Sequence, residues 1–454
     1  MKPDHIEVSR TLAAHAASTR YDDLPPAAFV AFKRALLDFL ACAISGSAMP
    51  VSRALLSYFE ETDPARTTAV IGTRSRLSPS NAAMVNGANC HGLDFDDGYL
   101  QAAAHPGGAV FPAVLAAAEQ RGASARDIVA AVVAGYDVML RIGATLHPAI
   151  AHRGFHNTAV AGVFGAAAGA ANLIGLNEQQ TRHALGIAGS FAGGIREYLD
   201  DGADVKRIHP GKAARDGLLC AEFAQRGITG PGKVLEGRYG LFHSHVNNEV
   251  RWERALDRLG ERWEIESVYF KPYPCCRGNQ TFIDAIRALR ERHEYAVGDI
   301  VRIDLGGYTH AIHGHDQKHH DNLLDAQMSL PCAAALALVF GDVTASMFLP
   351  EVLERPDVQA LIQRTNPFID DECDRLYPQK RSAFVRVALQ GGRKLEIRLQ
   401  DPKGEPANPM TNADLEHKLV ANCEAIIGGE RCSKLIEQVW QFETLTGAKD
   451  IVTN

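Results

Sequence analysis

Hydrophobic positions along the first 260 residues recur at the three- and four-residue spacing that is typical of amphipathic helices. Apolar faces and polar or proline starts predict helices over residues 26–44, 124–140, 158–174 and 177–190. The third helix carries Gly162, Gly165 and Gly169 on one side, and small residues at this spacing let neighbouring helices approach closely. Short turns between such helices predict an all-helical bundle, with the third helix near its centre.

The pattern changes near Tyr269. Residues 301–305 alternate like a half-buried strand and end at two glycines. Residues 384–389 and 395–399 flank Gly391-Gly392 and predict a β-hairpin. These strands, together with helical patterns at 331–340 and 358–364, predict a smaller domain that contains a sheet.

Helical patterns return from about Thr411, over residues 414–427 and 433–442. A chain of 454 residues is too long for one ordinary core, so two domains are expected. We therefore predict a mainly α protein. Both chain ends (1–267 and 404–454) are expected to form a large all-helical domain, with a smaller α+β domain (268–403) inserted between them.

The composition narrows the class of protein. Hydrophobic residues make up 46% of the chain and charged residues 22%, as in ordinary globular proteins. The formal net charge of -7 gives no support to nucleic-acid or membrane binding, and no apolar run approaches the roughly 20 residues that span a bilayer. Nine scattered cysteines and a polar start over residues 1–7 indicate a cytoplasmic protein with reduced thiols.

Clustered carboxylates and imidazoles mark the most informative segment. The stretch His91-Gly-Leu-Asp-Phe-Asp-Asp97 is followed eight residues later by His105-Pro-Gly-Gly, inside a region that is otherwise rich in alanine. Asp and His are costly to remove from water unless they are paired or used. A pocket that moves protons on a small polar substrate explains this cluster better than a structural role alone.

Several motifs of the chain resemble the MmgE/PrpD family. They are Asn86-Gly-Ala-Asn-Cys-His-Gly-Leu-Asp-Phe-Asp-Asp97, His105-Pro-Gly-Gly-Ala109, Gly154-Phe-His-Asn-Thr158, Lys271-Pro-Tyr-Pro-Cys-Cys-Arg277 and Asp325-Ala-Gln-Met-Ser-Leu-Pro331, in the family's order over roughly residues 8–450. The resemblance implies a helical domain with an α+β lid, usually in a homodimer, and an enzyme without metal or other cofactor. The family contains 2-methylcitrate dehydratases, cis-aconitate decarboxylases and iminodisuccinate epimerases.

These reactions develop charge next to a carboxylate, on a substrate that carries two or three carboxylates. Cations must therefore hold the acid groups, and a side chain of near-neutral pKa must carry protons. Lys206 matches an active-site lysine of the family and lies just before Gly211, where a helix is expected to start. The basic run around it contains Lys206, Arg207, His209, Lys212 and Arg215, any one of which could equally belong to a solvated basic face.

Lys271 begins a second candidate group. It precedes Pro272-Tyr-Pro274, a stiff extended segment that suits a side chain with a fixed direction. Arg277 could clamp a carboxylate bidentately, and Cys276 is a further substrate-binding candidate. The family often has a histidine where Cys276 or Arg277 stands here, which leaves the acid or base open and argues against simply assigning cis-aconitate decarboxylation.

His105 and His156 are the predicted proton carriers, because unperturbed imidazole titrates near neutral pH and both residues lie in matched motifs. Asp94 is predicted to orient a cation or a histidine, whereas Asp97 could do the same or only cap a turn. Tyr136 lies on an apolar helix face and is interpreted as a core residue.

No metal site is predicted. The histidines at positions 310, 313, 315, 319 and 320 match no compact zinc pattern and are interpreted as a polar loop of the smaller domain. The cysteines are not arranged for an iron–sulfur cluster, and the chain has no nucleotide-binding motif.

The predicted function is a cofactor-independent lyase that dehydrates a small di- or tricarboxylate, such as a 2-methylcitrate-like hydroxy acid, by proton abstraction next to a carboxylate. An iminodisuccinate-type epimerase and a cis-aconitate-type decarboxylase are alternatives, and so is a non-catalytic carboxylate-binding homologue. Lys206, Lys271 and Arg277 would bind the carboxylates, assisted by Arg207 and Cys276. The site is expected in the cleft between the two domains.

Overall fold

The structure, a computed structural model, describes residues 7–377 and 379–452 and divides into two compact units. The first unit contains the described residues up to Tyr198, Asp204–Tyr269, and the described residues from Asn412 onward. The second contains Leu199–Ala203 and the described residues of Phe270–Thr411. Residues 1–6 of the polar N-terminal segment lie outside the described residues. The predicted fold class, mainly α with a smaller α+β part, is confirmed.

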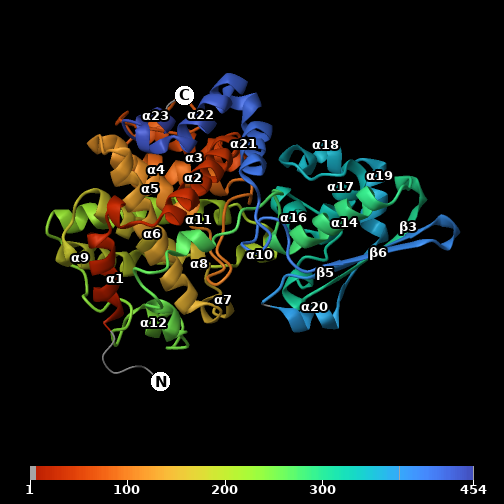
Figure 1. The fold of residues 1–454 in the computed structure, drawn as a ribbon, viewed down its shortest axis with the longest axis horizontal. Helices are drawn as coiled ribbons and strands as arrows, with labels where there is room; N and C mark the ends of the chain where they lie inside the picture. The colour runs from red at the N-terminus through yellow and green to blue at the C-terminus, as the bar shows by residue number, and fades with distance from the viewer. Residues whose placement is uncertain (1–6, 378, 453–454) are drawn as a thin grey trace. The chain divides into compact units, whose positions relative to one another are not determined.

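The first unit is built mainly from helices (Figure 1). Its longer helices are α1 (Val8–Ser18), α2 (Pro26–Gly46), α3 (Pro50–Thr62), α4 (Pro79–His91), α5 (Gly107–Arg121), α6 (Ala125–Leu146), α8 (Asn157–Leu173), α9 (Glu178–Phe191), α11 (Val205–Gln225), α21 (Asn412–Ile427) and α22 (Gly429–Trp440). Its short helices are α7 (Ala149–His152), α12 (Leu241–Ser244), α13 (Trp252–Ala255) and α23 (Lys449–Val452), and α10 (Tyr198–Asp201) lies where the chain leaves the unit. The unit is not all-helical as predicted, because β1 (Thr68–Ala69) and β2 (Arg76–Leu77) form an antiparallel pair.

Local capping fixes several of these helix starts. The Ser124 hydroxyl accepts a hydrogen bond from Asp127 N at the start of α6, and the Asn177 side chain accepts one from Gln180 N at the start of α9. The helix α2 begins at Pro26, whose fixed φ suits a first helical position. The four helices predicted in this region are therefore confirmed, with starts within two residues of the expected positions.

Close packing of small residues places α8 in the core. A Cβ atom added to Gly165 would lie 2.8 Å from Gly135 O of α6, and one added to Gly169 would lie 3.0 Å from Ala131 O. All residues of α8 from Asn157 to Ala171 are buried. The prediction that the glycine-bearing helix is central is confirmed.

The helix α6 corrects one expectation from the sequence. By length and composition it could cross a membrane, although no segment was expected to approach that length. The expectation counted only uninterrupted apolar runs, and charged residues interrupt this one. Its most apolar stretch is completely buried in the unit, so α6 has the character of a core helix.

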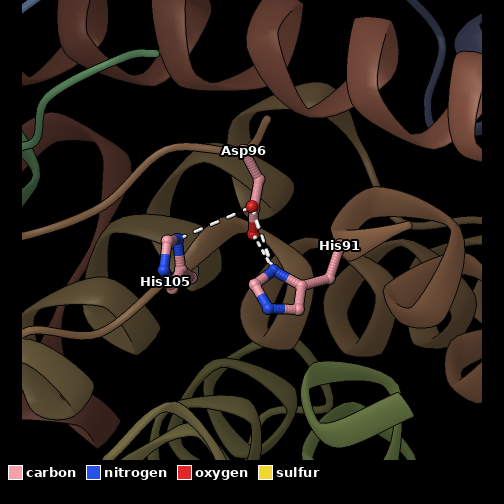
Figure 2. Close-up of side chains that lie close together, drawn as sticks. All are labelled: His91, Asp96 and His105. Carbon is pink, nitrogen blue, oxygen red and sulfur yellow. Dashed lines mark hydrogen bonds and ion pairs between the residues drawn. The ribbon is translucent and has the colours of Figure 1, made fainter. Parts of the chain in front are cut away.

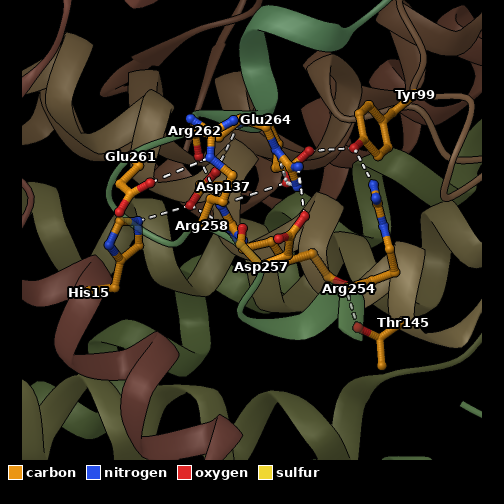
Figure 3. Close-up of polar contacts among 11 residues, drawn as sticks. His15, Tyr99, Asp137, Thr145, Arg254, Asp257, Arg258, Glu261, Arg262 and Glu264 are labelled. Carbon is orange, nitrogen blue, oxygen red and sulfur yellow. Dashed lines mark hydrogen bonds and ion pairs between the residues drawn. The ribbon is translucent and has the colours of Figure 1, made fainter. Parts of the chain in front are cut away.

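Polar contacts surround Asp137, a buried charged residue of α6 (Figure 3). Arg141 donates to Asp137 Oδ2 at 2.8 Å, and neither side chain is exposed. His15 of α1 lies 2.9 Å from Asp137 Oδ2, and Glu264 N donates to Asp137 Oδ1 at 2.9 Å. Arg262 pairs with Glu264. The partners compensate the cost of burying these charges and join α1 and the segment around Glu264 to α6.

Helix α21 is the first helix of the C-terminal segment. It lies beside α2 and anchors the loop that follows α4 (Figure 1). Lys418 of α21 donates to Asp38 Oδ1 and to Phe95 O, both at 2.6 Å. Its Nζ also lies 3.7 Å from the centroid of the Phe95 ring. Lys418 and Asp38 are both buried, so one ion pair ties both ends of the chain to residues 92–97.

Replacing Lys418 with methionine is expected to lower the free energy of unfolding by about 3–5 kcal/mol, because Asp38 would stay buried without its cation. Urea unfolding followed by circular dichroism measures the change. The control is Lys434→Met, since Lys434 is an exposed lysine of α22. Equal stability of the two variants would contradict a structural role for the Lys418 ion pair.

The second unit contains a four-stranded sheet with strand order β4-β3-β5-β6. Strand β3 (Ile300–Gly307) pairs in parallel with β4 (Thr365–Ile369) and antiparallel with β5 (Ala383–Leu389), and β5 pairs antiparallel with β6 (Lys394–Leu399). The predicted hairpin is confirmed, but β4 was not predicted. The helices are α14 (Gln280–Arg292), α15 (Thr309–Ile312), α16 (Leu323–Met328), α17 (Leu330–Phe340), α18 (Pro350–Leu353), α19 (Pro356–Arg364) and α20 (Asp371–Leu376).

Candidate active site

Helix ends bring His91 together with the predicted residues His156 and Lys206 of the first unit. His91 ends α4, His156 is the N-cap of α8, and Lys206 lies in the first turn of α11. Helices α4 and α11 cross closely: a Cβ atom on Gly87 would lie 2.6 Å from Gly211 Cα, so neither glycine leaves room for a side chain. This crossing brings the start of α11 to the loop that follows α4.

Lys206 forms a buried ion pair with Asp94. The distance from Lys206 Nζ to Asp94 Oδ1 is 2.6 Å. Asp94 has a φ of 51°, a strained conformation for a residue other than glycine, and the ion pair is one interaction that holds it there. The helix begins at Val205 and not at Gly211 as predicted, and it contains Pro210, which removes one intrahelical hydrogen bond. Lys206 is therefore a helix residue and not part of the preceding loop.

Arg207 supports the same loop. Its Nη1 donates to Gly92 O, and its Nε lies 3.5 Å from Asp204 Oδ1. The side chain is buried, and burial lowers the pKa of its guanidinium. The bond to Gly92 O holds the chain directly after α4. A role of Arg207 in carboxylate binding stays a prediction.

Asp96 lies between two imidazoles (Figure 2). His91 Nδ1 is 2.9 Å from Asp96 Oδ2, whereas His105 Nδ1 is 3.6 Å from Asp96 Oδ1 and 2.7 Å from Asp97 O. A backbone carbonyl can only accept, so the neutral His105 ring carries its hydrogen on Nδ1 and its lone pair on Nε2. In this tautomer His105 is arranged to accept a proton at Nε2.

The same three side chains offer the donor set that could hold a metal ion. His91, Asp96 and His105 each provide one atom, all within 4.8 Å of one another. Hydrogen bonds already account for this arrangement, because His105 Nδ1 faces a carbonyl and His91 Nδ1 faces both oxygens of Asp96. Among the described residues, the histidines between positions 310 and 320 form no such group.

Asp97 caps the next helix. Gly107 N donates to its Oδ1 at 2.9 Å, and Tyr136 OH donates to its Oδ2 at 2.8 Å. Burial, with the nearby charges of Asp38 and Asp96, raises the pKa of Asp97 well above its usual range. The sequence left open whether Asp97 orients a partner or caps a turn. Its side chain acts as a cap, because it accepts the hydrogen bond from Gly107 N. The glycines after Pro106 begin α5.

His156 forms a pair with His209 of α11. Their Nδ1 atoms are 2.9 Å apart, and both side chains are buried. Burial lowers the pKa of His156 well below its usual value and lowers that of His209 to about 4, and the positive charge of Lys206 acts in the same direction. Both rings are therefore neutral near pH 7.

Three residues of this cluster were not selected from the sequence. His91 and Asp96 belong to the stretch from His91 to Asp97, in which carboxylates and imidazoles cluster, and His209 belongs to the basic run after Lys206. The motifs marked the region of the site but could not show which side chains form pairs. His156 and His209, for example, are 53 positions apart in the chain. Only the packing of α8 against α11 brings these two rings together.

The second unit holds the remaining candidates. Arg277 contacts Glu405 Oε1 through Nη2 at 2.7 Å and through Nε at 3.2 Å. A substrate carboxylate would have to share this guanidinium with Glu405. Cys276 Sγ lies 3.8 Å from His315 Nε2, and Lys271 is buried. Their roles in binding stay predictions. All nine cysteines are free in the structure, and Cys276 is the one of them that is not buried.

Comparison with known proteins identifies the family. The MmgE/PrpD N-terminal domain matches residues 10–253, and the MmgE/PrpD C-terminal domain matches residues 273–442. The cis-aconitate decarboxylase-like protein oryM of Aspergillus oryzae is 28% identical over 453 residues, which cover 95% of this chain and 93% of that protein. Cis-aconitate decarboxylase of Mus musculus is 28% identical over 432 residues, covering 91% and 86%. The 2-methylcitrate dehydratase of Escherichia coli is 25% identical over 395 residues, covering 81% and 80%. The chain therefore belongs to the MmgE/PrpD family and is an enzyme of that type.

Proposed function

We propose that this enzyme is a lyase that acts on a small di- or tricarboxylate by moving a proton next to a carboxylate. One observation carries the proposal: a buried lysine lies in a cluster with three imidazoles. The ring centroids of His91 and His105 are 4.9 Å apart, those of His91 and His156 are 6.1 Å apart, and Lys206 lies near enough to His156 to lower its pKa. A cation beside imidazoles meets both requirements of the chemistry.

In the proposed mechanism, Lys206 binds a substrate carboxylate and stabilises the negative charge that develops when the neighbouring carbon loses its proton. The lone pair on His105 Nε2 accepts that proton. His156 takes up this proton in turn and delivers it to the departing hydroxyl group, which leaves as water while a carbon–carbon double bond forms, so both imidazoles return to their starting form. Asp94 orients Lys206 through their ion pair. Lys271 and Arg277 are proposed to bind further carboxylates.

Loss of water is the first reaction that we propose, because the cluster contains an imidazole arranged to accept a proton and a second imidazole that can pass this proton to the leaving group. Decarboxylation is the second candidate. The relatives named cis-aconitate decarboxylases match 91–97% of the chain, whereas those named 2-methylcitrate dehydratases match 81%. Cys276 and Arg277, which stand where the family often has a histidine, weigh against that candidate.

Incubation of the purified enzyme with 2-methylcitrate or cis-aconitate in deuterated water tests this proposal. The expected result is an unsaturated product of 2-methylcitrate that has lost water. Release of carbon dioxide from cis-aconitate would favour the second candidate, and deuterium exchange without loss of either group would indicate an epimerase. If neither exchange nor a product is found with any small di- or tricarboxylate, the lyase proposal is wrong.

A further inference from the structure

The contact between His156 and His209 restricts where hydrogens can lie. A neutral imidazole has one nitrogen that donates and one that accepts. The two Nδ1 atoms are 2.9 Å apart, a distance that fits one N–H···N hydrogen bond. Two lone pairs or two hydrogens facing each other at this distance would repel. One hydrogen therefore lies between the rings, and the two rings hold opposite tautomers.

This pairing couples the protonation of His156 Nε2 to that of His156 Nδ1. If the shared hydrogen is bonded to His156 Nδ1, then His156 Nε2 has a lone pair and can accept a proton. If the hydrogen is bonded to His209 Nδ1, then His156 Nε2 carries a hydrogen and can donate it. The partner ring thus decides whether His156 Nε2 can take up a proton or instead donates a hydrogen bond.

The surrounding residues hold both rings in place. The Tyr198 ring packs nearly edge-on to both, with centroid distances of 5.6 Å to His156 and 5.8 Å to His209. His156 N donates to Gly194 O at 2.8 Å. A Cβ atom on Gly194 would lie 3.3 Å from His209 Nε2, so the absent side chain leaves room for the ring. The short contact is therefore a fixed feature of the packing of α8 against α11.

We propose that His209 is a positioning residue, which sets the tautomer of His156 through the shared Nδ1 hydrogen. Its effect on turnover rests on the proposed function, in which His156 exchanges a proton with the substrate. The tautomer pairing itself does not depend on turnover, because it follows from the distance between two nitrogens in the protein without substrate.

Nitrogen-15 NMR of histidine-labelled enzyme at pH 7 tests the pairing directly, because ring nitrogens with and without hydrogen differ in chemical shift. The expected result is one ring protonated on Nδ1, the other on Nε2, and a coupling across the Nδ1–Nδ1 hydrogen bond. His183→Asn is the control, since His183 is a half-buried histidine whose Nδ1 faces Gly230 O instead. Rings that are both protonated on Nε2, or an imidazolium in the pair, would overturn the inference.

Two variants of His209 test the functional consequence. His209→Leu removes the hydrogen-bond partner, and kcat is expected to fall by about 10- to 100-fold with little change in KM, as for other residues that orient a functional histidine. His209→Asn keeps a group near Nδ1 that can donate or accept, so its kcat should lie within a few-fold of the parent value. Equal loss in both variants, or no loss in His209→Leu, would contradict a positioning role.

These measurements separate the inference from the proposed function. If no carboxylate is turned over but the NMR spectrum shows opposite tautomers, the lyase proposal fails and the pairing stands. If the parent enzyme turns over 2-methylcitrate or cis-aconitate but the spectrum shows independent rings, the lyase proposal stands and the inference fails.

Discussion

Replacing His156 with alanine is expected to lower kcat by about two to four orders of magnitude, the loss expected when an acid or base group is removed. The ring lies at the start of α8, faces His209 and is neutral near pH 7, so it can take up a proton and pass it on. Steady-state kinetics on the preferred carboxylate measure the loss, and circular dichroism checks the fold.

The pH profile of the parent enzyme gives a second readout for His156. Its lowered pKa means that protonation sets in only well below pH 6.5, so kcat should not fall between pH 7.5 and 6.5 on account of this ring. The control for the His156→Ala variant is His183→Ala, because His183 lies in α9 outside the cluster. A His156→Ala variant with kcat within tenfold of the parent value would remove His156 from the proposed mechanism.

Replacing Lys206 with methionine is expected to lower kcat/KM by about 100- to 1,000-fold, as when one stabilising group for a developing negative charge is removed. The variant loses the cation and also leaves Asp94 as a buried carboxylate without its lysine partner. That carboxylate would repel an anionic substrate, so KM should rise together with the fall in kcat. Initial-rate kinetics separate the two parameters.

A double variant distinguishes the two contributions. Lys206→Met combined with Asp94→Asn removes the repelling charge, so KM should recover partly while kcat stays low. Lys233→Met is the control, because Lys233 is an exposed lysine of the first unit. If Lys206→Met has the same kcat/KM as Lys233→Met, then Lys206 does not bind the substrate.

The sequence predicted those parts of the fold that depend on local signals. Ser124 and Asn177 cap α6 and α9 through neighbours three residues away, and such contacts can be read from the chain. The start of α11 was misplaced because a proline argues against a helix interior, yet Pro210 is the sixth residue of the helix, where it removes one hydrogen bond. Strand β4 was missed because Asn366-Pro367 resembles a turn.

The residues of the candidate site could be found by motif, but their contacts could not. Asp94 and Lys206 are 112 positions apart, and only the glycine crossing of α4 and α11 brings them to 2.6 Å. The role of Asp97 depends on its contacts with Tyr136 and Gly107. Both donate hydrogen bonds to its carboxylate, so Asp97 caps a helix. Contacts of this kind follow from packing, so the sequence alone left these alternatives open.

A crystal structure of the enzyme with bound citrate tests the central claim most directly. The claim predicts that a citrate carboxylate lies within hydrogen-bonding distance of Lys206 Nζ, with the central carbon facing His105 or His156. Citrate bound at saturation elsewhere in the protein, with no acid group near Lys206 or these imidazoles, would contradict it.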